Sequence, residues 1–264
     1  MTFPSALDPI RSLQAAWKLL VRAPAPLLVG GVLLTLFEGG PWAFVGVDKP
    51  HPERVVAAVI GFGCCCGVVS LLVSSWIELG LARSVDEVQH TGRCDLSTLW
   101  NTHGRYVDMV LARLLALGVV IAALVPAGIV ALGAALGQKL LHVDDGLVAL
   151  FAILGWLVYL PVFLYIVLGL SWVSQAVAIE GHGAVAALKR SWQLASGTRI
   201  ALAVYWLTLI VFAHLGICCF CVLYFLTSPL TYVSRTEAFL RLTRDEARPN
   251  PEAANVSAPP PLPN

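Results

Sequence analysis

Long runs of apolar residues are the feature of this sequence that most limits its possible folds. They cover residues 24–47, 55–81, 107–136, 147–179 and 200–242 of the 264-residue chain. A helix of about 20 apolar residues crosses the hydrocarbon core of a bilayer with its backbone polar groups paired internally. Each of the first four runs accounts for one such helix, and the fifth is long enough for two. The sequence therefore predicts an all-α integral membrane protein with six transmembrane helices.

The composition agrees with a membrane environment. Hydrophobic residues make up 58% of the chain, charged residues make up only 12%, and the mean hydropathy is +0.80. A soluble domain has about 25% charged residues, and a soluble globule of this size would not bury so much apolar surface. The net charge of +1 gives no indication of a nucleic-acid partner, and we expect none.

Glycine and proline mark the irregular points that we expect in the spans. The sequence EGGP at 38–41 predicts an irregular outer end for the first span. Proline removes a backbone donor and bends a helix, so we expect kinks at Pro126, Pro161 and Pro229. We place the division of the last run near 216–218, although that turn would contain no charge.

Residues 1–242 are expected to form one polytopic membrane domain. Residues 243–264 are rich in proline and polar residues and are expected to be a disordered cytoplasmic tail. The basic residues before the first apolar run are reminiscent of a secretory signal, but no convincing cleavage site follows them. We therefore interpret the first span as retained.

Three short amphipathic segments precede pairs of spans. Each carries a tryptophan seven residues before the expected start of a span (Trp17, Trp100 and Trp192) and a cation at or before the junction (Arg22, Arg105 and Arg199). Both residue types favour the headgroup level of a bilayer. The pattern predicts three hairpins, each preceded by a cytoplasmic interfacial amphipathic helix. The alternative is that any cytoplasmic membrane boundary attracts these residues.

These segments supply the expected contacts with lipid or with a partner protein. The residues are Arg11, Trp17, Lys18, Arg22, Trp100, Arg105, Lys189, Arg190, Trp192 and Arg199. The bilayer itself, with anionic lipid, is the expected partner, and a protein partner or a second copy of the chain remains open.

Three ionisable residues inside the spans are candidates for function, because a charge at membrane depth is costly. Glu38 lies in the first span, or at its outer end if the helix stops there. Glu78 is expected to form an ion pair with Arg83 or Arg113, with a substrate or proton role as the alternative. His214 is interpreted as a packed histidine that forms a hydrogen bond with a neighbouring helix, with a metal ligand or a proton relay as the alternative.

The sequence contains no nucleotide-binding loop, nucleophile elbow or paired-carboxylate motif. Its histidines lack metal-ligand spacing. We interpret the cysteine groups at 64–66 and 218–221 as small packing residues, with a thiol metal site or a disulfide as the alternative. No cofactor, no metal and no enzymatic activity are therefore expected.

Several segments resemble a known family. They are Leu79 to Gly92 with Leu99 and Trp100, VPAG at 125–128, IEGHG at 179–183, and ALKRSWQL at 187–194. Together they look like the membrane domain associated with glycerophosphoryl diester phosphodiesterases and related bacterial multi-pass proteins, over most of residues 10–242. The resemblance implies a helical bundle in the bacterial cytoplasmic membrane. It does not imply phosphodiesterase activity, because the catalytic barrel of those fusions is a separate domain.

We therefore expect a non-enzymatic multi-pass protein that organises lipids or partner proteins at the cytoplasmic membrane. A small transporter or channel subunit is the alternative, indicated by Glu38, His214 and the proline-containing spans. A membrane-embedded lipid enzyme has no group of residues to support it.

The distribution of basic residues predicts the orientation of the chain. With six spans, 14 of the 17 Lys and Arg residues fall on the side of the two termini, and only Lys49, Arg54 and Lys139 fall on the other. Under the positive-inside rule both termini are then cytoplasmic. A reporter fused to the C-terminus should be inaccessible to membrane-impermeant reagents in intact cells, and labelling from outside would contradict this orientation.

Overall fold

The computed structural model describes residues 5–43, 52–100, 104–141, 145–218 and 221–247. All its regular elements in these ranges are helices. In chain order they are η1 (Ser5–Leu7), α1 (Pro9–Arg22), α2 (Pro24–Ala43), α3 (Pro52–Thr91), α4 (Leu96–Trp100), α5 (Tyr106–Leu141), α6 (Asp145–Gly169), α7 (Val173–Gln175), the π-helix η2 (Ala176–Glu180), α8 (Ala184–Ala195), α9 (Arg199–Cys218) and α10 (Cys221–Ala247). The all-α prediction is confirmed for this part of the chain.

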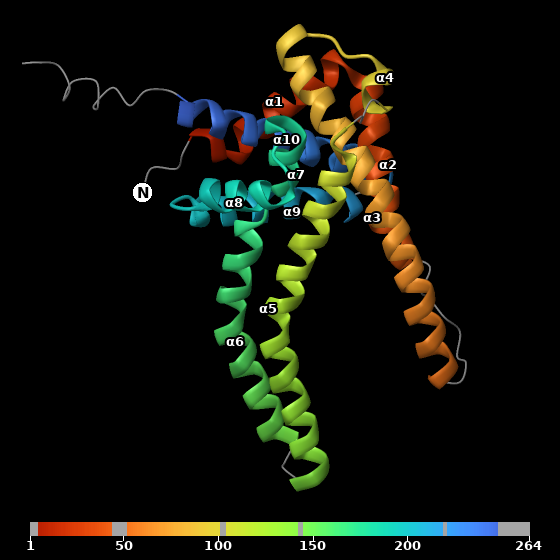
Figure 1. The fold of residues 1–264 in the computed structure, drawn as a ribbon, viewed down its shortest axis with the longest axis vertical. Coiled ribbons are helices and arrows are strands. Elements are labelled where there is room, and N and C mark those ends of the chain that lie inside the picture. Colours follow the sequence, from red (N-terminus) through yellow and green to blue (C-terminus); the bar gives the residue numbers. More distant parts are fainter. Residues whose placement is uncertain (1–4, 44–51, 101–103, 142–144, 219–220, 248–264) are drawn as a thin grey trace, which may run out of the picture.

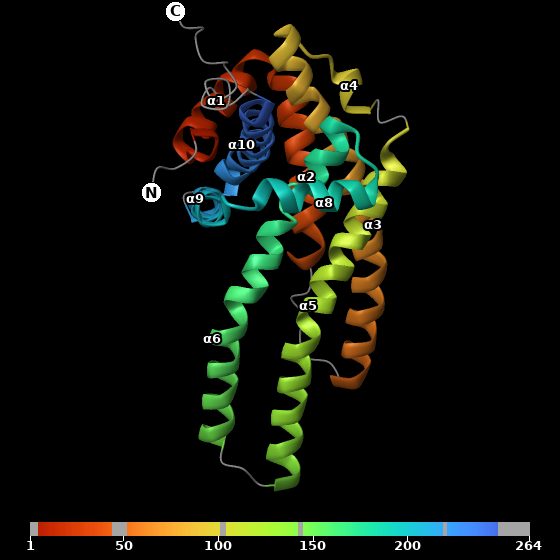
Figure 2. The same ribbon diagram turned by 60° about the vertical axis from the view of Figure 1, so that its left-hand side comes forward.

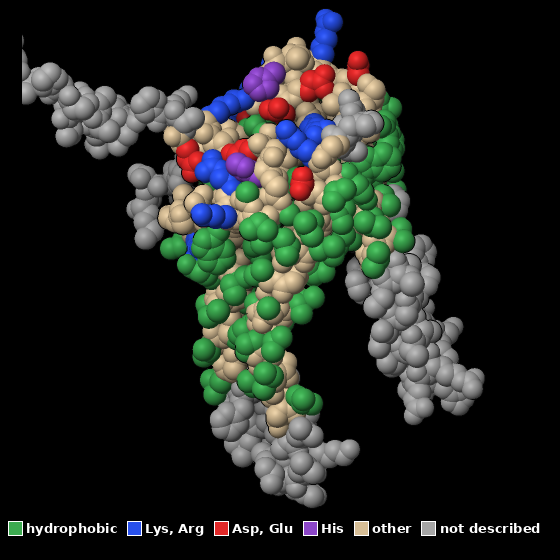
Figure 3. Space-filling view, in the orientation of Figure 1, with side chains coloured by type: hydrophobic (Ala, Val, Ile, Leu, Met, Phe, Trp, Pro, Cys, Tyr) green, Lys and Arg blue, Asp and Glu red, His purple; other side chains and the backbone are tan. Residues whose placement is uncertain are grey.

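Consecutive long helices pack against each other: α2 against α3, α5 against α6, and α9 against α10. Figures 1 and 2 show α5 and α6 running side by side away from the body of the protein. In Figure 2, α9 is seen end-on while α5 and α6 run vertically, so α9 crosses their direction. In the face shown in Figure 3, charged side chains gather at one end of the molecule, and hydrophobic side chains cover the described part of α5 and α6. The described part of this face is thus divided into a charged end and an apolar end.

Three helices are long and apolar enough to cross a membrane, or up to five if each of two bent helix pairs counts as one span. The three are Gly67–Thr91, Tyr106–Val130 and Ile153–Glu180, and the bent pairs are Pro9–Arg22 with Pro24–Leu36 and Ala184–Ala195 with Arg199–His214. The bends are 117° and 99°. These helices indicate a membrane protein, which agrees with the hydropathy of the sequence.

Helix ends differ from the sequence prediction at several points. The first span is not interrupted at 38–41, because α2 continues to Ala43. In an apolar environment, backbone polar groups are best paired within a helix. This requirement favours a helical conformation at the glycines and the proline of residues 39–41. At the other end of the chain, α10 extends to Ala247 and thus beyond the predicted boundary at 242. The division of residues 200–242 into two helices is confirmed, since α9 ends at Cys218 and α10 begins at Cys221.

The second amphipathic segment and the fourth span also differ in detail from the sequence prediction. The amphipathic segment expected before Arg105 is reduced to the five-residue α4 with Trp100 at its end, because α3 continues to Thr91. The predicted fourth span at 147–179 corresponds to the candidate span Ile153–Glu180. Within it, a turn after Gly169 leads into α7 and the π-helix η2. Ser171, Ser174 and Gln175 are buried in this irregular segment.

Side chains from α8 and α10 pair the backbone groups that the break in α6 leaves open. The Ser191 hydroxyl donates to the Gly169 carbonyl at 2.7 Å and accepts from the Trp172 N–H at 3.0 Å. The Arg235 guanidinium donates to the Ser171 carbonyl. Because buried backbone groups are costly when unpaired, α8 and α10 determine where α6 can end.

Close contacts between small residues bring α2 and α10 together. A Cβ atom added to Gly31 would lie 2.4 Å from the Cβ of Pro229, so only glycine allows this approach. One turn further along α2, the hydroxyl groups of Thr35 and Ser228 form a hydrogen bond. Such small-residue contacts with interhelical hydrogen bonds are typical of helix packing in membranes.

Replacing Ser191 by alanine should destabilise the protein measurably. The S191A variant leaves a buried N–H and a buried carbonyl without their partner, and each such group costs about 1–3 kcal/mol. The expected result is a lower melting temperature of the full chain in detergent, measured by circular dichroism. The matched control is S97A, whose side chain is exposed on α4, and equal melting temperatures for the two variants would contradict this role of Ser191.

Candidate functional site

A buried carboxylate on α3 is shared by two arginines from other helices. The side chain of Glu78 is only 5% exposed. Arg113 on α5 forms a direct ion pair with one carboxylate oxygen, and Arg235 on α10 lies 3.9 Å from the other. The expected ion pair between Glu78 and Arg113 is therefore present, and Arg235 adds a second guanidinium group.

In the cluster formed by Glu78, Arg113 and Arg235, Arg113 also makes hydrogen bonds to serine side chains. Arg113 Nη1 donates to the hydroxyls of Ser74 at 2.6 Å and Ser75 at 3.4 Å. Ser74, Ser75 and Glu78 share one face of α3 because residues three and four apart lie together on a helix. A buried charge is stable only when it is paired and hydrogen-bonded. This face of α3 gives Arg113 both an ion pair, with Glu78, and hydrogen bonds, to Ser74 and Ser75.

Arg235 links the cluster to α6 and α9. In addition to its contact with the Ser171 carbonyl, its guanidinium carbon lies 4.7 Å from the centroid of the Trp206 ring on α9, a distance at which the cation is attracted to the ring. The sequence interpretation counted Arg235 only as a cytoplasmic charge. A stripe of polar residues at helical spacing, Ser228, Thr231 and Arg235, was the available indication of an inward-facing role.

A cavity of about 270 Å³ lies beside Arg235, between α2, α9 and α10. It is lined by Thr35, Trp206, Leu209, Ile210, Ala213, His214, Ser228, Thr231, Tyr232 and Arg235. His214 lies 2.8 Å through Nδ1 from the Ile210 carbonyl, so Nδ1 carries the proton of that hydrogen bond. Of the three intramembrane candidates, Glu78 and His214 are thus near Arg235, whereas the side chain of Glu38 lies outside the described residues.

The candidate residues on α1 lie on the surface. Asp8 begins the helix by accepting hydrogen bonds from the N–H groups of Ile10 and Arg11, and its carboxylate is also 3.4 Å from Arg11. Trp17, Lys18 and Arg22 are exposed. Lys18 and Arg22 line a second pocket of about 220 Å³, which is completed by Ala15, Leu19, Gln89, Glu237 and Arg244.

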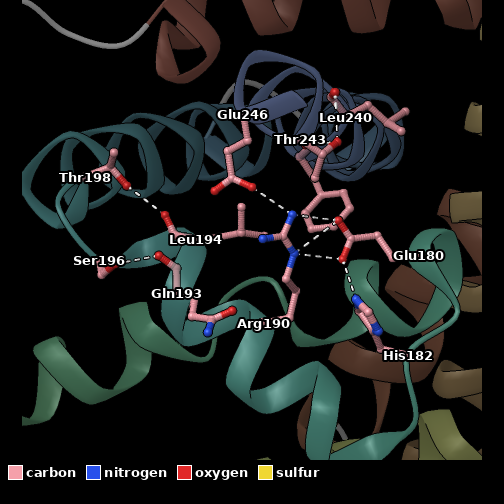
Figure 4. Close-up of polar contacts among 11 residues, drawn as sticks. Glu180, His182, Arg190, Gln193, Leu194, Ser196, Thr198, Leu240, Thr243 and Glu246 are labelled. Carbon is pink, nitrogen blue, oxygen red and sulfur yellow. Dashed lines mark hydrogen bonds and ion pairs between the residues drawn. The ribbon is translucent and has the colours of Figure 1, made fainter. Parts of the chain in front are cut away.

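On α8, Arg190 is held by two carboxylates (Figure 4). It donates three hydrogen bonds to Glu180, at 3.0, 3.1 and 3.3 Å, and one to Glu246 at 2.8 Å, and His182 lies 3.0 Å from Glu180. The hydrogen bonds that Arg190 donates to Glu180 raise the pKa of its guanidinium. Arg190 therefore joins α8 to η2 and α10, which leaves the neighbouring Lys189 as the exposed cation of the pair.

The aromatic candidates also have contacts within the protein. Trp192 packs so closely on Gly169 that an added Cβ there would lie 2.4 Å from its ring. The Arg199 guanidinium lies 3.3 Å from the Tyr165 ring centroid and 4.6 Å from that of Trp192. Trp100 contacts Trp76 with ring centroids 5.2 Å apart. Arg105 donates to the Ala178 carbonyl at 3.4 Å.

No group of three or more His, Cys, Asp or Glu residues suited to a metal ion occurs in the part of the chain that the structure describes. The side chains of the cysteines at 64–66 and 218–221 lie outside that part. Cys94 is a free thiol.

A model described as "Domain of unknown function (DUF7847)" matches residues 7–260. The chain belongs to this family. No curated protein and no solved structure matches it. The family match therefore gives no link to the membrane domain of glycerophosphoryl diester phosphodiesterases, and that finer resemblance lacks support.

Neutralising Glu78 should be far more damaging than neutralising a surface carboxylate. The E78Q variant leaves two largely buried guanidinium groups without their shared counter-charge, and breaking a buried pair costs about 3–5 kcal/mol. In D86N, which removes a surface partner of His90, the expected cost is below about 1 kcal/mol. Thermal unfolding in detergent compares the two variants. A D86N variant that melts as low as E78Q would contradict the role of the cluster.

Proposed function

We propose that the protein is a non-enzymatic multi-pass protein that binds anionic lipid headgroups at the cytoplasmic face of the membrane, through α1 and the pocket beside it. The observation that carries this proposal is the presence of three cations, Lys18, Arg22 and Arg244, around one pocket of about 220 Å³. Anionic lipid bound there would organise the surrounding bilayer or a partner protein.

The charges around the pocket support binding of an anion. Glu237, its one carboxylate, is 2.8 Å from Arg241 in an ion pair. Arg244 donates to the neutral amide oxygen of Gln89 at 2.7 Å. Lys18 and Arg22 form no ion pair with any described residue. The positive charge of the pocket is therefore largely uncompensated by protein.

The exposed half of α1 also suits the membrane surface. Ile10, Trp17 and Val21 are 65%, 49% and 62% exposed and form an apolar stripe at helical spacing. The basic residues at positions 11, 18 and 22 form the adjacent stripe. A helix with these two stripes lies in the interface with its apolar side toward the acyl chains. The 117° bend between α1 and α2 is consistent with α1 lying along the surface while α2 enters the bilayer.

We further propose the hairpins α2–α3, α5–α6 and α9–α10, each entered from the cytoplasm. Because α9 crosses the direction of α5 and α6 (Figure 2), six spans require α9 to take another direction in the bilayer. The pairwise packing of these helices supports this layout. A hairpin returns the chain to the side from which it started, so both termini lie on the side of α1. A location in the bacterial cytoplasmic membrane is part of the same proposal.

A small transporter or channel subunit is the second candidate function. The observation that favours it is the polar cavity beside Arg235, which contains His214 in a helix expected to span the membrane. Replacing His214 by glutamine should then reduce transport of a solute once one is identified.

The main proposal is tested by removing the two partner-free cations of the pocket. The full chain in nonionic detergent is titrated with phosphatidylglycerol or phosphatidylcholine, and bound lipid is counted by native mass spectrometry. The K18Q/R22Q variant should bind phosphatidylglycerol roughly 30-fold less tightly, because each cation near the surface contributes about 1 kcal/mol. Weak phosphatidylcholine binding should not change.

The matched control is R93E, which alters the net charge by the same amount at an exposed residue outside the pocket. It should retain phosphatidylglycerol binding. Equal losses in R93E and K18Q/R22Q would show a general charge effect and contradict a specific site.

A further inference from the structure

We infer that the Arg199 cluster, formed by Tyr165, Trp192 and Arg199 where α6, α8 and α9 meet, binds the phosphate of an anionic phospholipid whose acyl chain lies along α6. None of these three residues lines either of the two cavities described above. The site is therefore separate from the pocket beside α1, and the inference does not depend on the proposed function.

The first argument is the way in which the Arg199 guanidinium is held. Its central carbon lies 3.3 Å from the Tyr165 ring centroid and 4.6 Å from that of Trp192, and the two centroids are 5.6 Å apart. Trp192 is in turn packed against Gly169 at the end of α6. The rings therefore fix the cation in place before a ligand arrives, which reduces the entropy that binding costs.

The second argument is that the charge of Arg199 has no protein counter-charge. Its side chain forms no ion pair and no hydrogen bond with any described residue. An aromatic ring attracts a cation, but it does not replace an oxygen acceptor for the N–H groups. Although Nε is buried, the two Nη atoms remain accessible. An oxyanion can therefore reach them and accept charge-assisted hydrogen bonds.

The third argument is the level of the Arg199 cluster in the molecule. In Figure 3, Lys and Arg side chains lie over α8, at the border between the charged end and the apolar surface of α6. Lys189 is an exposed cation on the same face of α8 as Trp192, three residues away. Tryptophan, tyrosine and basic residues favour the headgroup level of a bilayer, where basic residues attract anionic lipid. The cluster thus lies where lipid phosphates are found.

The fourth argument is an apolar stripe that leads from the cluster toward the apolar end of α6. Val158, Val162 and Tyr165 follow one another at helical spacing and are 75%, 54% and 51% exposed. Tyr165 belongs to both the stripe and the cluster. An acyl chain packed on this stripe would hold the attached phosphate beside Arg199. A soluble phosphate would lack this contact, so the site favours a phospholipid.

The test uses the full-length K18Q/R22Q variant in nonionic detergent as the parent, so that tighter binding in the pocket beside α1 does not mask this site. The weaker binding of phosphatidylglycerol that remains in this parent is then binding at the Arg199 cluster. Binding is measured as a concentration-dependent rise in melting temperature.

Four probes separate the chemical features of the ligand. Dioleoyl phosphatidylglycerol has the phosphate, a net negative charge and the acyl chains. Dioleoyl phosphatidylcholine balances the phosphate with a cation, dioleoylglycerol lacks the phosphate, and inorganic phosphate lacks the chains. We expect phosphatidylglycerol to bind more tightly than each of the other three probes.

The decisive variant adds R199Q to the parent and so removes the charge from the cluster. It should weaken binding of phosphatidylglycerol roughly tenfold, because a charge-assisted hydrogen bond is lost. R199K keeps the positive charge and should recover most of this loss. The matched control R93Q removes an exposed cation directly after α3 and should bind as the parent does. The melting temperature of each variant without probe reports its folding.

Several results would overturn the inference. A parent that does not bind phosphatidylglycerol would assign all binding to the pocket beside α1. Equal binding of dioleoylglycerol would exclude recognition of the phosphate, equal binding of phosphatidylcholine would exclude selection of a net negative charge, and equal binding of inorganic phosphate would exclude a role of the acyl chains.

The variants give the remaining outcomes. An unchanged affinity in R199Q would place the lipid elsewhere, and equal losses in R199Q and R199K would assign the effect to altered packing of the rings. Either result overturns the inference. Binding of phosphatidylglycerol that persists in the parent but is lost in R199Q supports this site even if the pocket beside α1 fails its own test.

Discussion

The need to pair backbone groups at the broken end of α6 is the constraint on which the rest of this structure depends. A helix that stops inside a protein leaves carbonyl and N–H groups that water does not reach. Ser191 satisfies two of these groups from α8, and Arg235 satisfies a third from α10. The end of α6, the position of α8 and the position of α10 are therefore fixed together.

The same arginine connects this structural role with the candidate site. Arg235 reaches the Ser171 carbonyl, lies over Trp206 and approaches Glu78. A guanidinium group has five donors in a rigid plane, so it can join three helices where an ammonium group would satisfy fewer partners. The cavity beside it is lined by a residue that the fold already requires.

The sequence predicts the helices better than their environments. Apolar runs located the long helices, and the division of residues 200–242 was placed within a few residues of the break between α9 and α10. Within the run of Ala187 to Trp192, the sequence assigned Lys189, Arg190 and Trp192 to contact with lipid or a partner protein. The roles of this run depend on distant partners, since Ser191 pairs with Gly169 and Arg190 with Glu246. The role of Arg235 was missed for the same reason, because its partners lie on other helices.

Helices α1 and α8 share the pattern of a tryptophan with nearby cations, but their surroundings in the structure differ. The segments before α2 and α9 both combine tryptophan with cations, yet Arg190 on α8 is neutralised by Glu180 and Glu246, whereas Lys18 on α1 has no carboxylate partner among the described residues. On α1, the apolar face predicted from the sequence is divided, with Ala16 and Leu20 buried against the protein and Trp17 left outside. Tertiary packing thus gives α8 a mainly structural role. It leaves α1 with the free positive charge and the exposed tryptophan that an anionic membrane surface attracts.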